Sequence, residues 1–273
     1  MQLGHVGPAA CAHAVRDAIF GSGAVAASPC VRYRKSMLRS RPIVLLTGFG
    51  PFPRVPANAT SLLVPRLAEA AARAFPGVRI VAEILPTEWI AGPERALALY
   101  TAHDPRLAIH FGVSPRATGF AIETRGRNCC APSPDAAGAL PAAACCSPDG
   151  PSFLPTGLPA TLIVERLRRR GIPAHLSRDA GSYLCNALMY RTLELARRNG
   201  SPACTGFVHL PETLVDPRRP AREPLASSPL RWSDVIEGGL EIIAASLGRH
   251  RAPAHGLGRM PALNPFPSAA ADA

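Results

Sequence analysis

Hydrophobic and polar residues follow two different periods along residues 41–248. Short apolar runs bounded by glycine, proline or charged residues predict buried strands, and longer segments with apolar residues three and four positions apart predict helices. The predicted strands cover residues 43–47, 78–85, 107–113, 117–124, 174–177 and 205–210. The predicted helices cover residues 61–75, 88–102, 159–170 and 233–247, with a further helix from about 184 to 198. This alternation predicts an α/β domain whose largely parallel sheet is covered by helices on both faces.

The two ends of the chain lack this pattern. Residues 1–40 are rich in Ala, Gly, Cys and Arg and have no strong period, so we expect a disordered extension or a natural start at Met37. Residues 249–273 are rich in Ala and Pro and are expected to form a disordered tail. Within the domain, residues 129–155 combine Ala, Pro, Cys and Gly, which predicts a long surface loop.

The net charge of +11 raises the question of a polyanionic partner. Lys35 is the single lysine, and the arginines are scattered rather than interleaved with aromatic residues. The densest cluster, residues 168–170, falls at a predicted helix C-terminus, where positive charge is favoured anyway. No apolar run approaches the roughly 20 residues of a membrane span. We therefore expect neither a nucleic-acid nor a membrane partner.

The strongest chemical signal is a cysteine in the first turn of a predicted helix, Cys185. The helix is indicated by residues that repeat along one face, namely Leu184, Leu188, Thr192, Leu195 and Ala196. Backbone N–H groups at a helix start carry partial positive charge, which favours a thiolate over a thiol. Cys185 is therefore a candidate nucleophile; the alternative is a small buried thiol that only packs.

Two further residues would complete a catalytic set with this thiol. His209 lies near the end of the 205–210 strand, which Pro211 terminates, and strand ends are where α/β folds build their sites. Glu123 lies on an otherwise apolar strand, where a carboxylate is costly to bury without a partner. A thiol nucleophile, an imidazole base and a carboxylate that orients the imidazole form a complete hydrolytic group. Spacing alone does not establish that the three residues meet.

Four segments of the chain share motifs with a known family. Residues 46–52 read LTGFGPF and are followed by Asn58; Glu123 precedes Asn128 by five positions; residues 177–186 read SRDAGSYLCN; residues 207–211 read FVHLP. They match, in order and distance, the patterns T-G-F-x-P-F, E-R-x-x-x-N, S-x-x-A-G-x-Y-L-C-N and F-x-H-x-P. The chain thus resembles pyroglutamyl peptidase I, also called pyrrolidone-carboxylate peptidase, the cysteine peptidases that remove an amino-terminal pyroglutamate.

The resemblance implies a three-layer α/β/α sandwich with a twisted, mostly parallel mixed sheet in residues 41–248. It implies that Cys185 is the nucleophile, His209 the general base and acid, and Glu123 the residue that orients the histidine. Phe49 and Phe52 would sandwich the pyrrolidone ring, although ordinary core packing is the alternative for both. The remaining implied residue, which would support the same loop and pocket, is Asn58. The substrate would be a peptide or small amide, and the assembly a homo-oligomer, by resemblance a tetramer.

Several positions depart from the family pattern. Val113 stands where a glutamine associated with substrate contacts is usual, Ala117 stands where an arginine is usual, and Thr124 follows the glutamate in place of an arginine. After Asn128, the usual D-A-R-I-P-D is replaced by CCAPSPD, so an arginine expected to help at the site has no counterpart. A site that loses polar groups loses selectivity. A related thiol amidohydrolase with a different acyl group, or an inactive binding homologue, therefore remains open.

The eight cysteines give no metal signal. Cys129-Cys130 and Cys145-Cys146 are adjacent pairs rather than C-x-x-C, and no histidine lies at ligand spacing, so we expect no metal and no cofactor. A catalytic thiol must stay reduced, which favours the cytoplasm. Cys204 precedes the His209 strand and is expected to pack rather than react.

Overall fold

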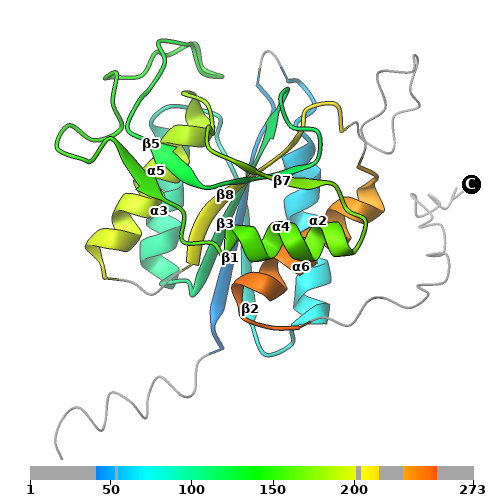
Figure 1. Cartoon of the computed structure of the whole chain (residues 1–273). Helices are drawn as coiled ribbons and strands as arrows, with labels where there is room; N and C mark the ends of the chain where they lie inside the picture. Colours follow the sequence, from blue (N-terminus) through cyan, green and yellow to red (C-terminus); the bar gives the residue numbers. More distant parts are fainter. Residues whose placement is uncertain (1–40, 53–54, 201–203, 215–229, 251–273) are drawn as a thin grey trace, which may run out of the picture. The chain divides into compact units, whose positions relative to one another are not determined.

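The computed structural model describes residues 41–52, 55–200, 204–214 and 230–250, which all belong to one compact unit beginning at Arg41. Their centre is a six-stranded sheet with the strand order β2-β1-β3-β8-β4-β7 (Figure 1). The predictions made for residues 1–40, including the start at Met37, lie outside the described residues, and so does almost all of the predicted tail.

The strands agree with the apolar runs of the sequence to within a few residues. They are β1 (Ile43–Phe49), β2 (Arg79–Leu85), β3 (Leu107–Ser114), β4 (Phe120–Glu123), β7 (Ala174–Ser177) and β8 (Cys204–Pro211). Four of them, β1, β2, β3 and β8, are parallel. Strand β4 runs antiparallel to β8, and β7 runs parallel to β4, so the sheet is mixed but mostly parallel. The fold is of the α/β class, as the sequence predicts.

Helices cover both faces of the sheet (Figure 1). One face packs against α2 (Ala59–Ala74), α4 (Ala160–Arg169) and α6 (Trp232–Ser246). The other packs against α3 (Ala91–His103) and α5 (Leu184–Arg198). Successive side chains of a strand point to opposite faces, so each strand contributes alternate residues to these two cores. On β8, for example, Val208 joins the first core and Phe207 joins the second.

The predicted loop at residues 129–155 contains structure that the sequence pattern did not reveal. Its last residues form β6 (Phe153–Pro155), which pairs antiparallel with β5 (Arg125–Arg127) in a separate two-stranded sheet. Strands of three residues are too short to show alternation. The expectation of an irregular loop over the whole segment is therefore wrong at its C-terminal end. Residues 128–152 remain a long connection between the two strands.

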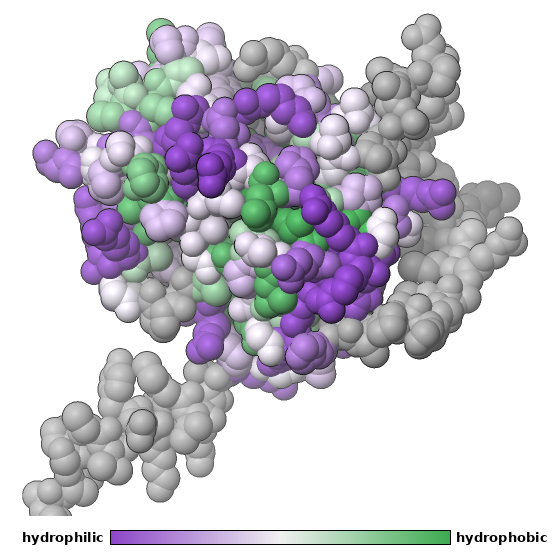
Figure 2. All heavy atoms as spheres, viewed as in Figure 1, coloured by the Kyte–Doolittle hydropathy of each residue, from purple (hydrophilic) through white to green (hydrophobic). Residues whose placement is uncertain are grey.

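The arginine-rich end of α4 takes part in both surface and internal contacts. Arg168 and Arg169 are exposed, and hydrophilic residues dominate the surface over this helix (Figure 2). Arg170 bonds Glu237 and Glu241 of α6 at 2.9 Å each. Arg166 is also buried next to Glu241. These ion pairs join the two helices on one side of the sheet. No helix in the described part of the chain is long and apolar enough to cross a bilayer.

Candidate active site

The candidate site lies at the carboxyl ends of the central parallel strands. Phe49 ends β1, Gly112 and Val113 are near the end of β3, and His209 is near the end of β8. Gly112 and His209 are register partners across the β3–β8 pair. Carboxyl ends of neighbouring strands are the usual position of sites in α/β sheets, because the loops that leave them open a crevice there.

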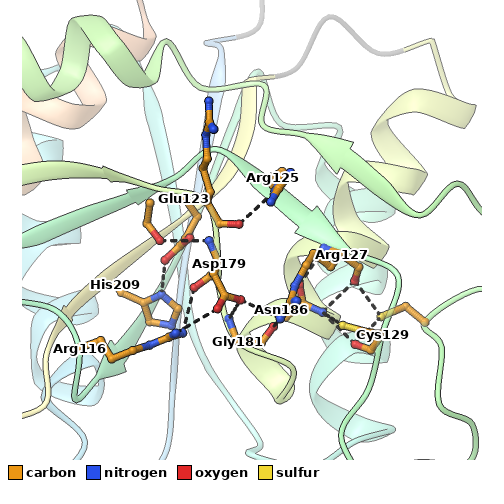
Figure 3. Close-up of polar contacts among 12 residues, drawn as sticks. Arg116, Glu123, Arg125, Arg127, Cys129, Asp179, Gly181, Asn186 and His209 are labelled. Carbon is orange, nitrogen blue, oxygen red and sulfur yellow. Dashed lines mark hydrogen bonds and ion pairs between the residues drawn. The ribbon is translucent and has the colours of Figure 1, made fainter.

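Glu123 and His209 are in direct contact. Glu123 Oε1 lies 2.8 Å from His209 Nδ1, and both side chains are almost fully buried (Figure 3). The contact depends on the antiparallel pairing of β4 and β8, in which Ala121 lies opposite His209. Glu123 is two residues further along β4, on the same face, so its longer side chain reaches the histidine diagonally. The largely parallel sheet predicted from the periodicity would not by itself give this arrangement; the mixed sheet implied by the family resemblance does.

His209 also interacts with Cys185, and this changes the charge of the imidazole. Burial alone lowers the pKa of a histidine, because the charged form loses its hydration. At His209 this effect is outweighed by the charge and hydrogen bond of Cys185 and by those of Glu123, which together raise the pKa to about 9. The imidazole is therefore protonated at neutral pH. A protonated imidazole between a carboxylate and a thiol is the arrangement that stabilises a thiolate.

The sulfur of Cys185 is held at a position that requires a glycine beneath it. Cys185 is the second residue of α5, and no side chain caps the N-terminus of this helix. A Cβ atom built on Gly112 would lie 2.9 Å from Cys185 Sγ and 2.8 Å from Phe207 Cζ. Gly112 thus lets the helix start approach the end of the sheet closely. The backbone N–H groups of the first turn remain available to a ligand.

A cavity of about 320 Å³ opens over these residues. Cys185 and His209 line it together with Val113 and the side chains of the two predicted aromatic residues, Phe49 and Phe52. The volume is at the small end of the range for ligand pockets, so it fits a compact group. The structure therefore brings all three predicted catalytic residues and both aromatic residues to one site.

Asn58 shapes the loop that carries the aromatic residues. Its Oδ1 accepts hydrogen bonds from Thr60 N at 3.1 Å and Thr60 Oγ1 at 2.9 Å, which caps α2. Its Nδ2 donates to the carbonyl of Gly50 at 3.1 Å, and Thr87 Oγ1 donates to the same carbonyl at 3.0 Å. Asn58 also lines the cavity. A single buried amide therefore fixes both the start of α2 and the turn after β1.

Sequence reasoning missed a charged network beside the site. Asp179 accepts from Arg116 at 3.0 Å and from Arg127 at 2.8 Å, and its Oδ1 also accepts from the backbone N–H of Gly181 at 3.1 Å (Figure 3). Arg116 lines the cavity. The network joins the loop after β3, strand β5 and the turn that leads into α5. Its members were not recognisable beforehand because their contacts span about 50 to 60 positions.

Asn186, next to the candidate nucleophile, forms a second link between the start of α5 and strand β5. Its Oδ1 accepts from the backbone N–H of Arg127, and its Nδ2 donates to the carbonyls of Arg127 and Cys129, at 2.8 to 2.9 Å. The side chain therefore pairs with the edge of β5 as another strand would. Its place beside Cys185 in the SRDAGSYLCN motif was the one sequence signal that pointed to it.

A second histidine, His110, lies on the same face of the sheet and was also missed. Its Nδ1 is 2.7 Å from Thr47 Oγ1, and no partner for Nε2 is found among the described residues. Complete burial lowers its pKa to about 4, so it is neutral. His110 does not line the cavity. Within the described ranges, no cluster of three or more His, Cys, Asp or Glu side chains could hold a metal ion.

The fold and the site together place a thiol, an imidazole and a carboxylate at the carboxyl ends of an α/β sheet, the groups that cysteine hydrolases combine. The sequence model of the pyroglutamyl peptidase family matches residues 43–224. The chain therefore belongs to the pyroglutamyl peptidase family and is a cysteine-type peptidase.

Characterised relatives agree with this assignment. The chain is 32% identical over 168 residues to the pyrrolidone-carboxylate peptidase of Oceanobacillus iheyensis, covering 62% of this chain and 83% of that protein. It is 32% identical over 182 residues to the same-named enzyme of Pyrococcus furiosus, covering 63% and 84%. The solved structure of Bacillus amyloliquefaciens pyroglutamyl peptidase I superposes with a TM-score of 0.64 at 28% identity, covering 76% of this chain and 97% of that one.

Proposed function

We propose that this protein hydrolyses the amide bond that follows an amino-terminal pyroglutamyl residue, with Cys185 as nucleophile, His209 as general acid and base, and Glu123 as the residue that orients His209. The observation that carries the proposal is the buried Glu123–His209 contact of 2.8 Å beside an aromatic-lined cavity whose wall His209 shares with Cys185. We assign this catalytic role to the domain at residues 41–248.

The charge of His209 fits the order of steps. The thiolate of Cys185 attacks the carbonyl carbon, and the C–S bond forms as the carbonyl electron pair moves to oxygen. Nδ1 of His209 is bonded to Glu123, which leaves Nε2 to protonate the departing nitrogen as the C–N bond breaks. The neutral imidazole then takes a proton from water, which attacks the thioester and releases the thiolate. Uncapped N–H groups at the start of α5 would bind the oxyanion.

The cavity suits a flat, neutral lactam. A pyroglutamyl ring offers two apolar faces and an amide edge, so aromatic walls and backbone hydrogen bonds suffice to recognise it. Phe49 is 2% exposed and fixed within the core, whereas Phe52 is half-buried and also packs on Tyr183 with ring centroids 6.2 Å apart. Phe49 thus combines core packing with a position in the pocket wall.

A second candidate function is hydrolysis of an amide with a different acyl group by the same three residues. The observation in its favour is that Val113, which stands where the family pattern has a glutamine, contributes an apolar residue to the cavity wall. Arg116 supplies a nearby positive charge, but it is already paired with Asp179. An inactive binding protein is the third outcome that an assay must distinguish.

A panel of coumarin amides that differ only in the acyl group tests these candidates. We expect the pyroglutamyl amide to be cleaved fastest, and Cys185→Ala to lose on the order of 10⁴-fold or more in kcat. Cys204→Ala, which removes another partly buried thiol at the start of β8, is the matched control and should stay within about twofold. Faster cleavage of another acyl amide supports the second candidate, and no cleavage of any amide supports the third.

Two further features are proposed with this function. A catalytic thiol must stay reduced to act, so we propose the cytoplasm. We also propose a homo-oligomer, tetrameric by resemblance, which light scattering of the purified protein would test. A monomeric mass at micromolar concentration would contradict the oligomer.

A further inference from the structure

The long connection between β5 and β6 holds two thiols that the proposed hydrolysis does not use. Cys130 Sγ and Cys146 Sγ are 3.6 Å apart, both are partly buried, and both pack against the core that includes α5. They are 16 positions apart in the sequence. Residues this far apart in the chain do not meet through sequence proximity alone, so other interactions in the loop must hold the two thiols in contact.

Hydrogen bonds around the two thiols hold the two segments of the loop together. The backbone N–H of Cys130 donates to the carbonyl of Ala144 at 2.8 Å. Asn128 Oδ1 accepts from the N–H groups of Cys146 at 2.8 Å and Ser147 at 2.9 Å, and its Nδ2 donates to the carbonyl of Ser147 at 2.7 Å. These hydrogen bonds fix the backbone on both sides, so the two thiols are held opposite each other.

We propose that Cys130 and Cys146 form a redox-active dithiol site that reacts with low-molecular-weight disulfides of the glutathione type and closes to an intramolecular disulfide. Disulfide exchange needs an attacking thiolate and a second thiol that resolves the mixed disulfide. The geometry provides both within one contact, and it assigns a modification site separate from Cys185.

The surroundings of the two sulfurs give them different roles. The hydrogen bond from Cys146 lowers the pKa of Cys130, burial opposes this, and the charge of Arg191 lowers it further. The pKa of Cys146 is raised, first by its hydrogen bond to Cys130 and then by burial. The carbonyl oxygens of Cys129 and Arg127 lie 3.6 and 3.7 Å from Cys146 Sγ and are alternative acceptors for its single S–H. Cys130 is thus the attacking sulfur and Cys146 the resolving one.

The exchange balances in two steps. Cys130 thiolate attacks one sulfur of oxidised glutathione, that S–S bond breaks, and the first glutathione leaves as a thiolate that takes up the proton of Cys146. Cys146 thiolate then attacks the Cys130 sulfur of the mixed disulfide, and the second glutathione leaves with the electron pair. The two protein thiols are oxidised by two electrons, and one oxidised glutathione is reduced to two reduced molecules.

Closure of this disulfide would stiffen a segment that touches the active-site wall. Ala131 N donates to the carbonyl of Ser182 at 2.7 Å, and Tyr183 Oη donates to the carbonyl of Pro134 at 2.9 Å. Tyr183 lines the cavity next to Cys185. The redox state of the loop is therefore linked in space to the aromatic side of the pocket.

Mass spectrometry of the intact chain after treatment with oxidised glutathione tests the proposal. After alkylation of free thiols, cleavage at arginine and before aspartate separates residues 128–134 from residues 135–148, so a disulfide between the two halves links two peptides. We expect the linked pair to form, its fragments to place the bond between Cys130 and Cys146, and dithiothreitol to reverse it. Cys130→Ser and Cys146→Ser should each abolish the pair.

The adjacent cysteines provide matched controls. Cys129→Ser and Cys145→Ser should leave the linked peptides unchanged. Three results would overturn the proposal. The first is glutathione recovered only on Cys185, and the second is a bond that forms equally well through Cys129 and Cys145. The third is that all four thiols of the two cysteine pairs stay free under excess oxidised glutathione. Because the readout is the covalent bond and not peptidase activity, it is independent of the proposed function.

Discussion

Two buried histidines on neighbouring strands have opposite charge states. His110 on β3 and His209 on β8 face the same side of the sheet and are 0% and 4% exposed. Both rings neighbour Phe207, with centroid distances of 6.5 and 4.8 Å. Yet the pKa of His110 is lowered to about 4 by burial, and that of His209 is raised to about 9 against the same effect.

The difference lies in the partners and not in the burial. His110 bonds a neutral hydroxyl, Thr47 Oγ1, whereas His209 contacts the carboxylate of Glu123 and the sulfur of Cys185. A hydroxyl can hydrogen-bond a neutral imidazole, but it provides no charge to offset the hydration that a buried imidazolium loses. Burial alone thus favours a neutral histidine, whereas the contacts of His209 with Glu123 and Cys185 favour its protonated form.

Removal of the carboxylate should move the pKa of His209 only part of the way towards that of His110, because Cys185, the larger raising influence, remains. In Glu123→Gln the amide keeps the shape and a hydrogen bond but not the charge. We expect kcat/KM for the pyroglutamyl coumarin amide to fall roughly a thousandfold, because the imidazolium loses its orientation and stabilisation. The thermal unfolding midpoint checks that the fold persists. Unchanged activity in a folded variant would show that Glu123 does not orient His209.

Gly112, the register partner of His209, is a second feature of the His209 site, because its missing side chain leaves room for Cys185 Sγ. In Gly112→Ala the added methyl would lie 2.9 Å from Cys185 Sγ and displace it. We expect a loss on the order of a hundredfold in kcat, since small misplacements of reacting atoms are costly. Gly77→Ala is the matched control, because nothing lies within 4 Å of that position. Equal activity of the two variants would contradict the close approach.

The pH profile reads out the charge of His209 directly. Its raised pKa means that the imidazolium persists below about pH 9 and is lost above it. Because the protonated ring donates to the leaving nitrogen, kcat/KM should fall about tenfold per pH unit above pH 9. In Glu123→Gln the contribution of Glu123 to the raised pKa is lost while that of Cys185 remains, so the alkaline limb should move to lower pH. A wild-type limb near pH 6.5 would indicate an ordinary histidine.

The smallest effect is expected at His110. Thr47→Val replaces the hydroxyl by a methyl group and leaves Nδ1 without its partner. We expect the free energy of unfolding to fall by about 1 to 3 kcal/mol, the cost of an unsatisfied buried polar group. Denaturant titration measures this, and the alkaline limb of the pH profile should not move. A shifted limb would mean that His110 and His209 are coupled.

Much of this molecule could be predicted from its sequence. The strands and helices follow from local periodicity, and Cys185 and His209 from their places at a helix start and a strand end. Family membership follows from the SRDAGSYLCN motif, and the comparisons confirm it.

What local sequence patterns did not predict depends on long-range register. The pairing of Glu123 with His209 was expected only from the family resemblance, because it depends on the antiparallel pairing of β4 with β8, and no local pattern encodes strand direction. Asp179 reads as an ordinary loop residue, although two arginines from separate segments converge on it. His110 sits in an apolar run where its neutral state depends entirely on what surrounds it. The short strand Phe153–Pro155 lacks enough residues to show a period.

The antiparallel pairing of β4 with β8 also disfavours a shifted register between these strands. Side chains on a strand alternate between faces, so a slip of one residue would turn Glu123 towards the apolar layer under α2, α4 and α6. His209 would stay on the opposite face of the sheet, so the two groups would lose their contact, and burial of a carboxylate without that partner is costly. The Glu123–His209 contact thus favours the observed register of β4 over one shifted by a single residue.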